Sequence, residues 1–210
     1  CHFYSPFRQS SVIQPHRTAC NDEQCNQYAA NRPLIVGQSI SGSVQAESLT
    51  HPGQSQLPDK FALQRSMPNV QGSCIWYSAV MANNEGGCTD YLAQTYHRYP
   101  ALQPLMPFID AQAPKKVKGL KVKAMPDGLY LMWLEPKART EMDRATRYVV
   151  YRFPKGQPRD LQNPAHIVTI TDQTCIRLPY AGGATGYTYV VTALDRIQNE
   201  SKPKSKSIKL

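Results

Sequence analysis

The stretch Tyr187-Thr-Tyr-Val-Val-Thr-Ala-Leu-Asp195 decides the fold of the second half of this 210-residue chain. Its β-branched and aromatic residues are typical of a β-strand, and Gly186 directly before it marks a turn. Side chains alternate across a strand, so every second residue from Tyr187 to Ala193 lies on one face. A strand this apolar needs a second sheet to cover that face.

Residues 113–210 contain further strand-like stretches, separated by turn residues at regular spacing. This pattern predicts an all-β domain, a seven-stranded β-sandwich. Trp133, Tyr148 and Tyr189 are expected in its core, whereas Tyr151 is expected on an outer face, free to pack against the first half. The expected strands cover residues 117–122, 128–133, 147–153, 167–170, 175–178, 187–195 and 202–209.

Residues 1–112 form a separate α/β region by the same analysis. Apolar strands are expected at 34–40 and 70–78, a helix at 57–67, and a second helix from Thr89. Residues 41–56 are rich in Ser, Gly and Gln and are expected to form a long loop. Strand, helix, strand, helix is the order of a parallel β-α-β-α segment.

Several short motifs in this region resemble a known enzyme family. They are Gly37-Gln-Ser-Ile40, Val70-Gln-Gly-Ser73, Trp76-Tyr-Ser78 and Tyr99-Pro-Ala-Leu102. Their order and spacing are similar to the end of the glycosyl-hydrolase-like family 10-like proteins of Bacteroidetes. The resemblance implies the last two βα units of a TIM barrel, followed by an all-β domain. The chain departs from that family by lacking the first strands of the barrel.

The second half resembles a fibronectin type III domain. The resemblance rests on Trp133, Tyr148-Val-Val-Tyr-Arg152, Leu178, Val191-Thr-Ala-Leu-Asp195 and Asn199-Glu-Ser201. The fold alone does not define a function. In secreted glycosidases such modules are usually spacers or scaffolds, and the resemblance implies that role here.

The family resemblance places sugar-contacting residues at the carboxyl ends of the two strands, where TIM barrels carry their sites. These residues are Gln38, Ser39, Trp76, Tyr77 and Ser78. Aromatic rings and amide donors suit a carbohydrate, which offers apolar faces and hydroxyl groups. Two alternatives stay open: ordinary packing for the two aromatic residues, and a buried structural amide for Gln38.

Glycoside hydrolysis usually needs two carboxyl groups across the scissile bond. The first half holds seven Asp and Glu residues, and none lies on an expected strand. Glu47 and Glu85 lie in the loops after the two strands, but neither is assigned as catalytic. Enzymatic activity of the chain is therefore uncertain, and little or no catalysis is expected from this chain alone.

Positive charge is concentrated in the second half. Residues 1–110 carry 6 Lys/Arg against 7 Asp/Glu, whereas residues 111–210 carry 18 against 8. The lysines are spread over strands without stacking aromatics, so we expect a solvated basic surface and no nucleic-acid partner. Lysines on the terminal strand also discourage edge-to-edge pairing.

Five of the six cysteines lie in the first half. Cys20-x4-Cys25 has no second close pair, so no metal site or cofactor is expected. Disulfides Cys20–Cys25 and Cys74–Cys88 or free thiols remain alternatives. Cys1 is either a fragment boundary or the lipid anchor of a lipoprotein. No apolar run reaches the ~18 residues of a transmembrane segment.

Two functional hypotheses follow. The first is the C-terminal portion of a secreted, periplasmic or cell-surface carbohydrate-active enzyme, whose β-sandwich is a scaffold and whose partner is a glycan. The alternative is a non-enzymatic extracellular binding or adhesion module.

Overall fold

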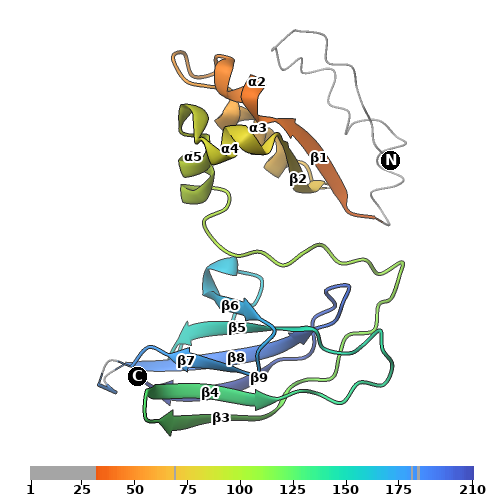
Figure 1. Cartoon of the computed structure of the whole chain (residues 1–210), viewed down its shortest axis with the longest axis vertical. Coiled ribbons are helices and arrows are strands. Elements are labelled where there is room, and N and C mark those ends of the chain that lie inside the picture. The colour runs from red at the N-terminus through yellow and green to blue at the C-terminus, as the bar shows by residue number, and fades with distance from the viewer. Residues whose placement is uncertain (1–31, 69, 181, 184) are drawn as a thin grey trace. The chain divides into compact units, whose positions relative to one another are not determined.

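The computed structural model describes residues 32–68, 70–180, 182–183 and 185–210, and the chain divides into two compact units, 1–98 and 99–210 (Figure 1). The predictions for Cys1, Cys20 and Cys25 lie outside the described residues. Each unit is described by itself below.

The first unit is built on two parallel strands, β1 (Leu34–Ser39) and β2 (Val70–Trp76). Helix α3 (Leu57–Ser66) connects them in sequence and packs on one face of the sheet, where Gln64 reaches Gln38. The other face carries exposed side chains, including Ile35 and Cys74. Among the described residues, therefore, one face of this sheet is covered and the other is open.

Four short helical segments complete the first unit: α2 (Ile40–Gln45), α4 (Ser78–Ala82), η1 (Glu85–Gly87) and α5 (Cys88–Gln94). Two of them correct the sequence-based expectation, because α2 begins the predicted long loop and α4 begins at the predicted end of the second strand. Ile40 and Val80 are buried in a common core. Short helices of low intrinsic propensity form when such tertiary packing stabilises them. The other members of this core are Leu57, Phe61, Cys88 and Leu92.

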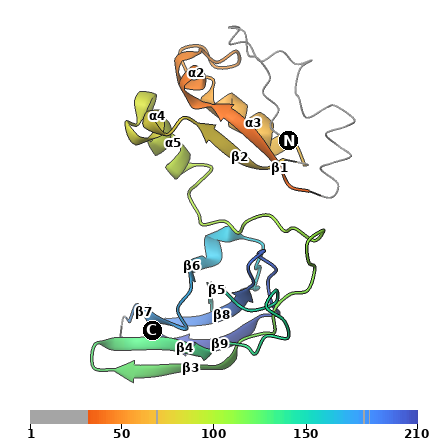
Figure 2. The same ribbon diagram turned by 45° about the vertical axis from the view of Figure 1, so that its right-hand side comes forward.

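The second unit contains two antiparallel sheets, one of order β3-β4-β7 and one of order β6-β5-β8-β9 (Figure 2). Their core holds Trp133 and Tyr148, whose rings meet edge to face at 5.5 Å between centroids, together with Tyr189. Because these side chains come from both sheets, the expected β-sandwich core is confirmed. The strands are β3 (Lys118–Met125), β4 (Gly128–Leu134), β5 (Arg147–Pro154), β6 (Ile167–Thr171), β7 (Cys175–Leu178), β8 (Gly186–Leu194) and β9 (Lys204–Lys209), with the 3-10 turn η2 (Pro164–His166) before β6.

The outer face of the larger sheet is also buried. Tyr151 and Phe153 of β5 are 0% exposed and form a second cluster, against which Leu102 and Leu161 pack. The Tyr151 hydroxyl donates a hydrogen bond to Glu200 at 2.8 Å, and burial raises the pKa of this phenol. The expectation that Tyr151 lies exposed on an outer face is therefore wrong. Leu102, in the segment of residues 99–113 that we call the linker, and Leu161, in the loop after β5, cover that face.

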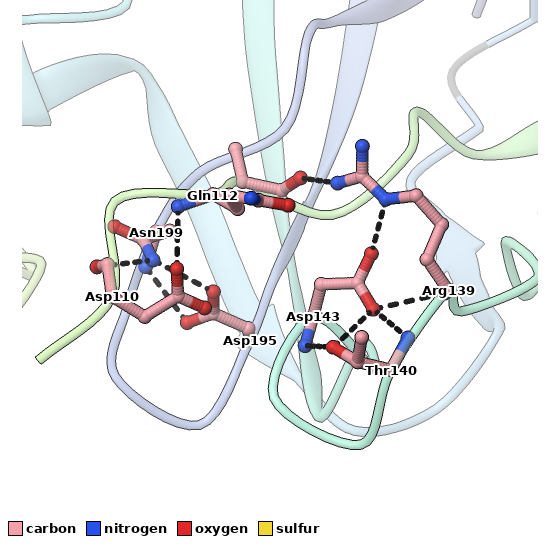
Figure 3. A network of polar contacts seen from close by, with 8 residues as sticks. Asp110, Gln112, Arg139, Thr140, Asp143, Asp195 and Asn199 are labelled. Carbon is pink, nitrogen blue, oxygen red and sulfur yellow. Dashed lines mark hydrogen bonds and ion pairs between the residues drawn. The ribbon is translucent and has the colours of Figure 1, made fainter.

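Two buried acidic groups hold the linker on the sandwich (Figure 3). Asp143 accepts a 2.6 Å hydrogen bond from Arg139 Nε, and the same guanidinium donates through Nη2 to the carbonyl oxygen of Ala113 at 2.9 Å. Asn199, bound to Asp195 at 2.9 Å, donates to the carbonyl oxygen of Asp110 at 3.1 Å.

These contacts place residues 99–112 in the second unit, whereas the sequence suggested a boundary after residue 112. The linker contains Pro100, Pro104 and Pro107, a composition that favours an extended segment but does not reveal the surface on which the segment lies. A boundary at residues 98 and 99 follows from the packing of Leu102 and from the bonded linker carbonyls.

Replacing Trp133 with Ala should lower the free energy of unfolding of the second unit by roughly 3–5 kcal/mol, because it removes a large aromatic side chain from the core. Urea denaturation followed by circular dichroism measures this. Leu134→Ala on the same strand is the control: this side chain is 65% exposed, and the change should stay within about 0.5 kcal/mol. Equal losses for the two variants would contradict the core position of Trp133.

Asp143→Asn should lower the melting temperature at pH 7. Hydrogen bonds from Arg139 and from the Thr140 amide hold the pKa of Asp143 well below its usual value of 3.8. A carboxyl whose pKa is lower in the folded state stabilises fully above its unfolded pKa, and that contribution is lost as the pH falls below about 4. The difference between wild type and variant should therefore shrink between pH 5 and pH 3.

Thermal melts across this pH range test whether the Asp143 carboxylate is stabilising. Glu141→Gln in the same loop is the control, because the Glu141 side chain is 86% exposed. A pH-independent difference between wild type and Asp143→Asn would assign the loss to something other than the carboxylate charge.

Candidate functional site

The carboxyl ends of β1 and β2 lie side by side, because Ser39 is the register partner of Trp76. This brings the strand ends with Gln38, Ser39 and Trp76 to one edge of the first unit. Tyr77 and Ser78 follow directly, Ser78 as the first residue of α4. The sequence-predicted residues therefore share one edge, although their side chains differ in role.

Trp76 and Tyr77 present the largest apolar surfaces of this edge. Their side chains are 68% and 46% exposed, and their rings lie 6.2 Å apart between centroids at an interplanar angle of 55°. The peptide bond between them is cis. Of the alternatives left open by the sequence, core packing does not describe Trp76, since two thirds of the side chain is accessible. Exposed rings of this kind can stack on the apolar face of a ligand.

Gln38 has a structural role instead. It is 9% exposed, and its Nε2 donates to Gln64 Oε1 at 2.8 Å. Gln64 in turn donates to the carbonyl oxygen of Gly72 at 2.9 Å and accepts a 2.8 Å hydrogen bond from Ser73 Oγ. This chain of bonds satisfies buried amides and links both strands to α3. The alternative of a buried structural amide is the one that the geometry favours.

Ser39 and Ser78 are both exposed. The carbonyl oxygen of Ser39 accepts a 2.6 Å hydrogen bond from the buried hydroxyl of Ser43, which accepts one from Lys60 Nζ at 3.0 Å. Burial lowers the pKa of Lys60. These bonds connect α2 and α3 to the end of β1 and leave the two exposed serine hydroxyls of the edge available for a ligand.

A polar cluster that the sequence analysis did not identify closes the loop between α2 and α3. Asp59, in the first turn of α3, accepts hydrogen bonds from Ser48 Oγ at 2.5 Å and Thr50 Oγ1 at 2.9 Å. The Ser48 bond is the main reason that the pKa of Asp59 lies below its usual value. Asp59 is thus ionised at neutral pH, where it cannot act as a proton donor. Ser48 and Asp59 are 11 residues apart, so no local sequence signal joins them.

The two loop glutamates do not lie on the strand ends. Glu47 accepts a 2.9 Å hydrogen bond from the Gly53 amide, and Glu85 is exposed in η1. Asp90 accepts from Asn84 Nδ2 at 2.7 Å in a cap of α5. No carboxylate side chain comes from β1 or β2 themselves.

The two described cysteines of the first unit are Cys74 and Cys88. Cys74 and Cys88 are both free thiols, one exposed and the other buried, so the Cys74–Cys88 disulfide is not formed. No cluster of three metal-ligating side chains occurs within residues 32–68, 70–180, 182–183 and 185–210. In the same part of the chain, no helix is long and apolar enough to cross a membrane.

Comparison with known proteins gives one curated relative, Glycosyl hydrolase YngK of Bacillus subtilis. The two are 31% identical over 154 residues, which is 71% of this chain and 29% of the relative. The chain thus spans less than a third of the length of that protein. No family model matches the sequence.

Solved structures that are similar to the chain include fibronectin type III proteins. The FN3tt mutant is 20% identical and covers 46% of this chain and 94% of its own, with a TM-score of 0.35. The titin kinase with its flanking domains is 24% identical (46% of this chain, 17% of its own, TM-score 0.35). The spore cortex lytic enzyme SleM of Clostridium perfringens is 14% identical (46% of this chain, 28% of its own, TM-score 0.32).

Proposed function

We propose that this chain is the C-terminal portion of a carbohydrate-active enzyme of the glycoside hydrolase type. Its first unit contributes one part of a glycan-contacting surface, the edge formed by Ser39, Trp76, Tyr77 and Ser78. The similarity to Glycosyl hydrolase YngK supports the class. The proposal includes a localisation outside the cytoplasm, in the periplasm, at the cell surface or in the medium. Polymeric glycans are found there because they are too large to cross a membrane unaided.

The observation that carries the proposal is the exposure of Trp76 at the carboxyl end of β2. Trp76 is 68% exposed and the adjoining Tyr77 is 46% exposed, so their two rings form a contiguous apolar patch, and such patches mark sites of contact with a ligand or partner. Sugar rings offer C–H faces to such a side chain, and the serine hydroxyls on the same edge match sugar hydroxyls.

The two units have different parts in this proposal. The first, with two parallel strands, is one section of a larger barrel-like domain, whose further strands pair with the outer edges of β1 and β2. The second is a fibronectin type III-like scaffold, stabilised by its own core and held to the linker by Asp143 and Asp195. As a scaffold or spacer, it takes no part in bond cleavage in this proposal.

A non-enzymatic glycan-binding module is the second candidate. The observation in its favour is that neither β1 nor β2 supplies a carboxylate. Both candidates require Trp76 to contact sugar, and they differ in whether the complete protein hydrolyses it.

Trp76→Ala should weaken the binding of neutral oligosaccharides to the chain by at least about fivefold, since a stacked aromatic contact contributes on the order of 1 kcal/mol. Titration calorimetry or ligand-observed NMR against a panel of β-linked and α-linked oligosaccharides measures the change. Tyr180→Ala is the matched control, because that ring is 64% exposed on the second unit. Equal affinities of wild type and Trp76→Ala, or equal losses in both variants, would overturn the assignment.

The chain alone should hydrolyse no glycoside at an enzymatic rate. Effective catalysis needs two carboxyl groups fixed on rigid elements, and the strands of the first unit hold none. Assays on aryl glycosides and polysaccharides test this, with Glu47→Gln and Glu85→Gln as controls. Turnover that either substitution abolishes would refute the expectation and make that glutamate catalytic.

A further inference from the structure

Nine lysines lie on two neighbouring edge strands of the sandwich or in the segments directly before them, six on the strands and three before them. β3 is an edge strand of the smaller sheet and β9 of the larger one, and the two strands pack against each other. Every one of these lysines is exposed. We call this set the lysine edge; it consists of Lys115, Lys116, Lys118, Lys121, Lys123, Lys202, Lys204, Lys206 and Lys209.

The lysine edge has no matching negative charge in its own strands. No Asp or Glu occurs in any strand of the second unit from β3 to β9. The acidic residues lie in loops, where several are engaged elsewhere: Asp143 with Arg139, Asp195 with Asn199, and Glu200 with Tyr151. Among the described residues, none of the nine lysines forms an ion pair.

Protection against edge-to-edge pairing does not account for so many charges. Charged side chains on an edge strand block its pairing, but Lys115, Lys116 and Lys202 lie outside both strands. On β9, Lys204 and Lys206 lie on one face about 6.6–6.8 Å apart along the strand, and Lys209 lies on the other face. Exposed ammonium groups gathered on two adjacent strands produce a positive potential that suits a linear chain of negative charges.

We propose that the lysine edge binds a linear anionic polysaccharide, of the kind that carries uronic acid carboxylates. The choice of a glycan among polyanions rests on the proposed function, whereas the basic surface itself does not. The hydroxyl of Ser207, which lies within 3.3 Å of Thr188 Oγ1, is on the same face of β9 as Lys209, where it adds a group that can hydrogen-bond sugar hydroxyls.

Two other polyanions fit the surface less well. Nucleic acid recognition relies on arginine forks and stacking aromatic residues, and β3 and β9 contain neither. Stable attachment to an anionic membrane usually adds apolar side chains that insert among the lipids. The exposed residues of these strands are lysines with small neighbours such as Ser205, Ser207 and Ala124, which offer no such insertion.

The test measures binding of the complete chain to polygalacturonate, a linear polyuronate, by calorimetry or affinity electrophoresis. The wild type should bind, and its affinity should fall as NaCl rises from 50 to 300 mM, because salt screens exposed charges. The variant with Lys121, Lys123, Lys204 and Lys206 all replaced by Gln should bind at least about tenfold more weakly. Its melting temperature should match that of the wild type, since all four side chains are exposed.

The matched control removes four positive charges elsewhere on the second unit, at the exposed Lys137, Arg144, Lys155 and Arg196. It has the same net charge as the first variant and should lose less than about threefold in affinity. Equal losses in both variants would show an effect of net charge alone and overturn the proposal, as would no binding by the wild type.

Duplex DNA and phosphatidylserine vesicles serve as competing polyanions. Tighter binding of either one through the same four lysines would replace the glycan by that partner. Trp76→Ala separates this proposal from the proposed function, because it should reduce binding of neutral oligosaccharides and leave binding of polygalacturonate unchanged. If the wild type binds polygalacturonate but no neutral oligosaccharide, the proposed function has failed. If it binds neutral oligosaccharides but no polygalacturonate, the present proposal has failed.

Discussion

Burial of both faces of β5 and β8 is the constraint on which the second unit depends. The inner face packs Tyr148 and Tyr189 against the opposite sheet, while the outer face carries Tyr151 and Phe153, which also need cover. An antiparallel sheet commonly leaves its outer face to water. Here that face is apolar, so a further layer must exist, and the linker with Leu102 and the loop with Leu161 provide it. The linker is consequently a part of the domain and not a tether.

Apolar packing alone does not fix the path of the linker on the sandwich. Hydrogen bonds to the linker carbonyl groups fix it. A linker carbonyl at Ala113 is bound by Arg139, whose position Asp143 fixes, and a second carbonyl at Asp110 is bound by Asn199. Ala113 and Asp110 are both half-buried, and a charged donor such as the Arg139 guanidinium forms a stronger hydrogen bond than a neutral one. The first unit lacks a comparable second layer among its described residues. Its sheet is covered by α3 on one face only, which leaves Trp76 and the strand ends accessible.

The sequence predicted those parts of the fold in which local pattern and burial agree. Alternation along Tyr187–Ala193 placed Tyr189 in the core, and the turn residues around it located the strands. Tyr151 was misplaced because alternation assigns a residue to a face but cannot tell which distant segment covers that face. The helices α2 and α4 were missed for a related reason, since Ile40 and Val80 are held by contacts that no local signal records.

The site was predictable in its location and less so in its chemistry. Strand ends can be found from the sequence, and Trp76 was identified there. The role of Gln38 depends on Gln64 of α3, which is 26 residues away in the sequence. A glutamine on an expected strand has the same one-letter signal whether it binds a ligand or a buried amide, and only the position of its partner distinguishes them.

The distribution of charge in the second unit also follows from which side chains the fold buries. The sandwich places its acidic groups in loops, where buried or half-buried carboxylates order the backbone, and its lysines on the strands at the edges. A carboxylate used inside a loop cannot neutralise a lysine on a distant edge, because solvent and salt screen charges over about 10 Å. The net positive charge of the second half is therefore concentrated on a surface instead of being averaged over the molecule. Such a concentration keeps edge strands of neighbouring molecules apart and, by the same potential, attracts a polyanion. The same lysines thus satisfy both a requirement of the fold and a requirement of recognition.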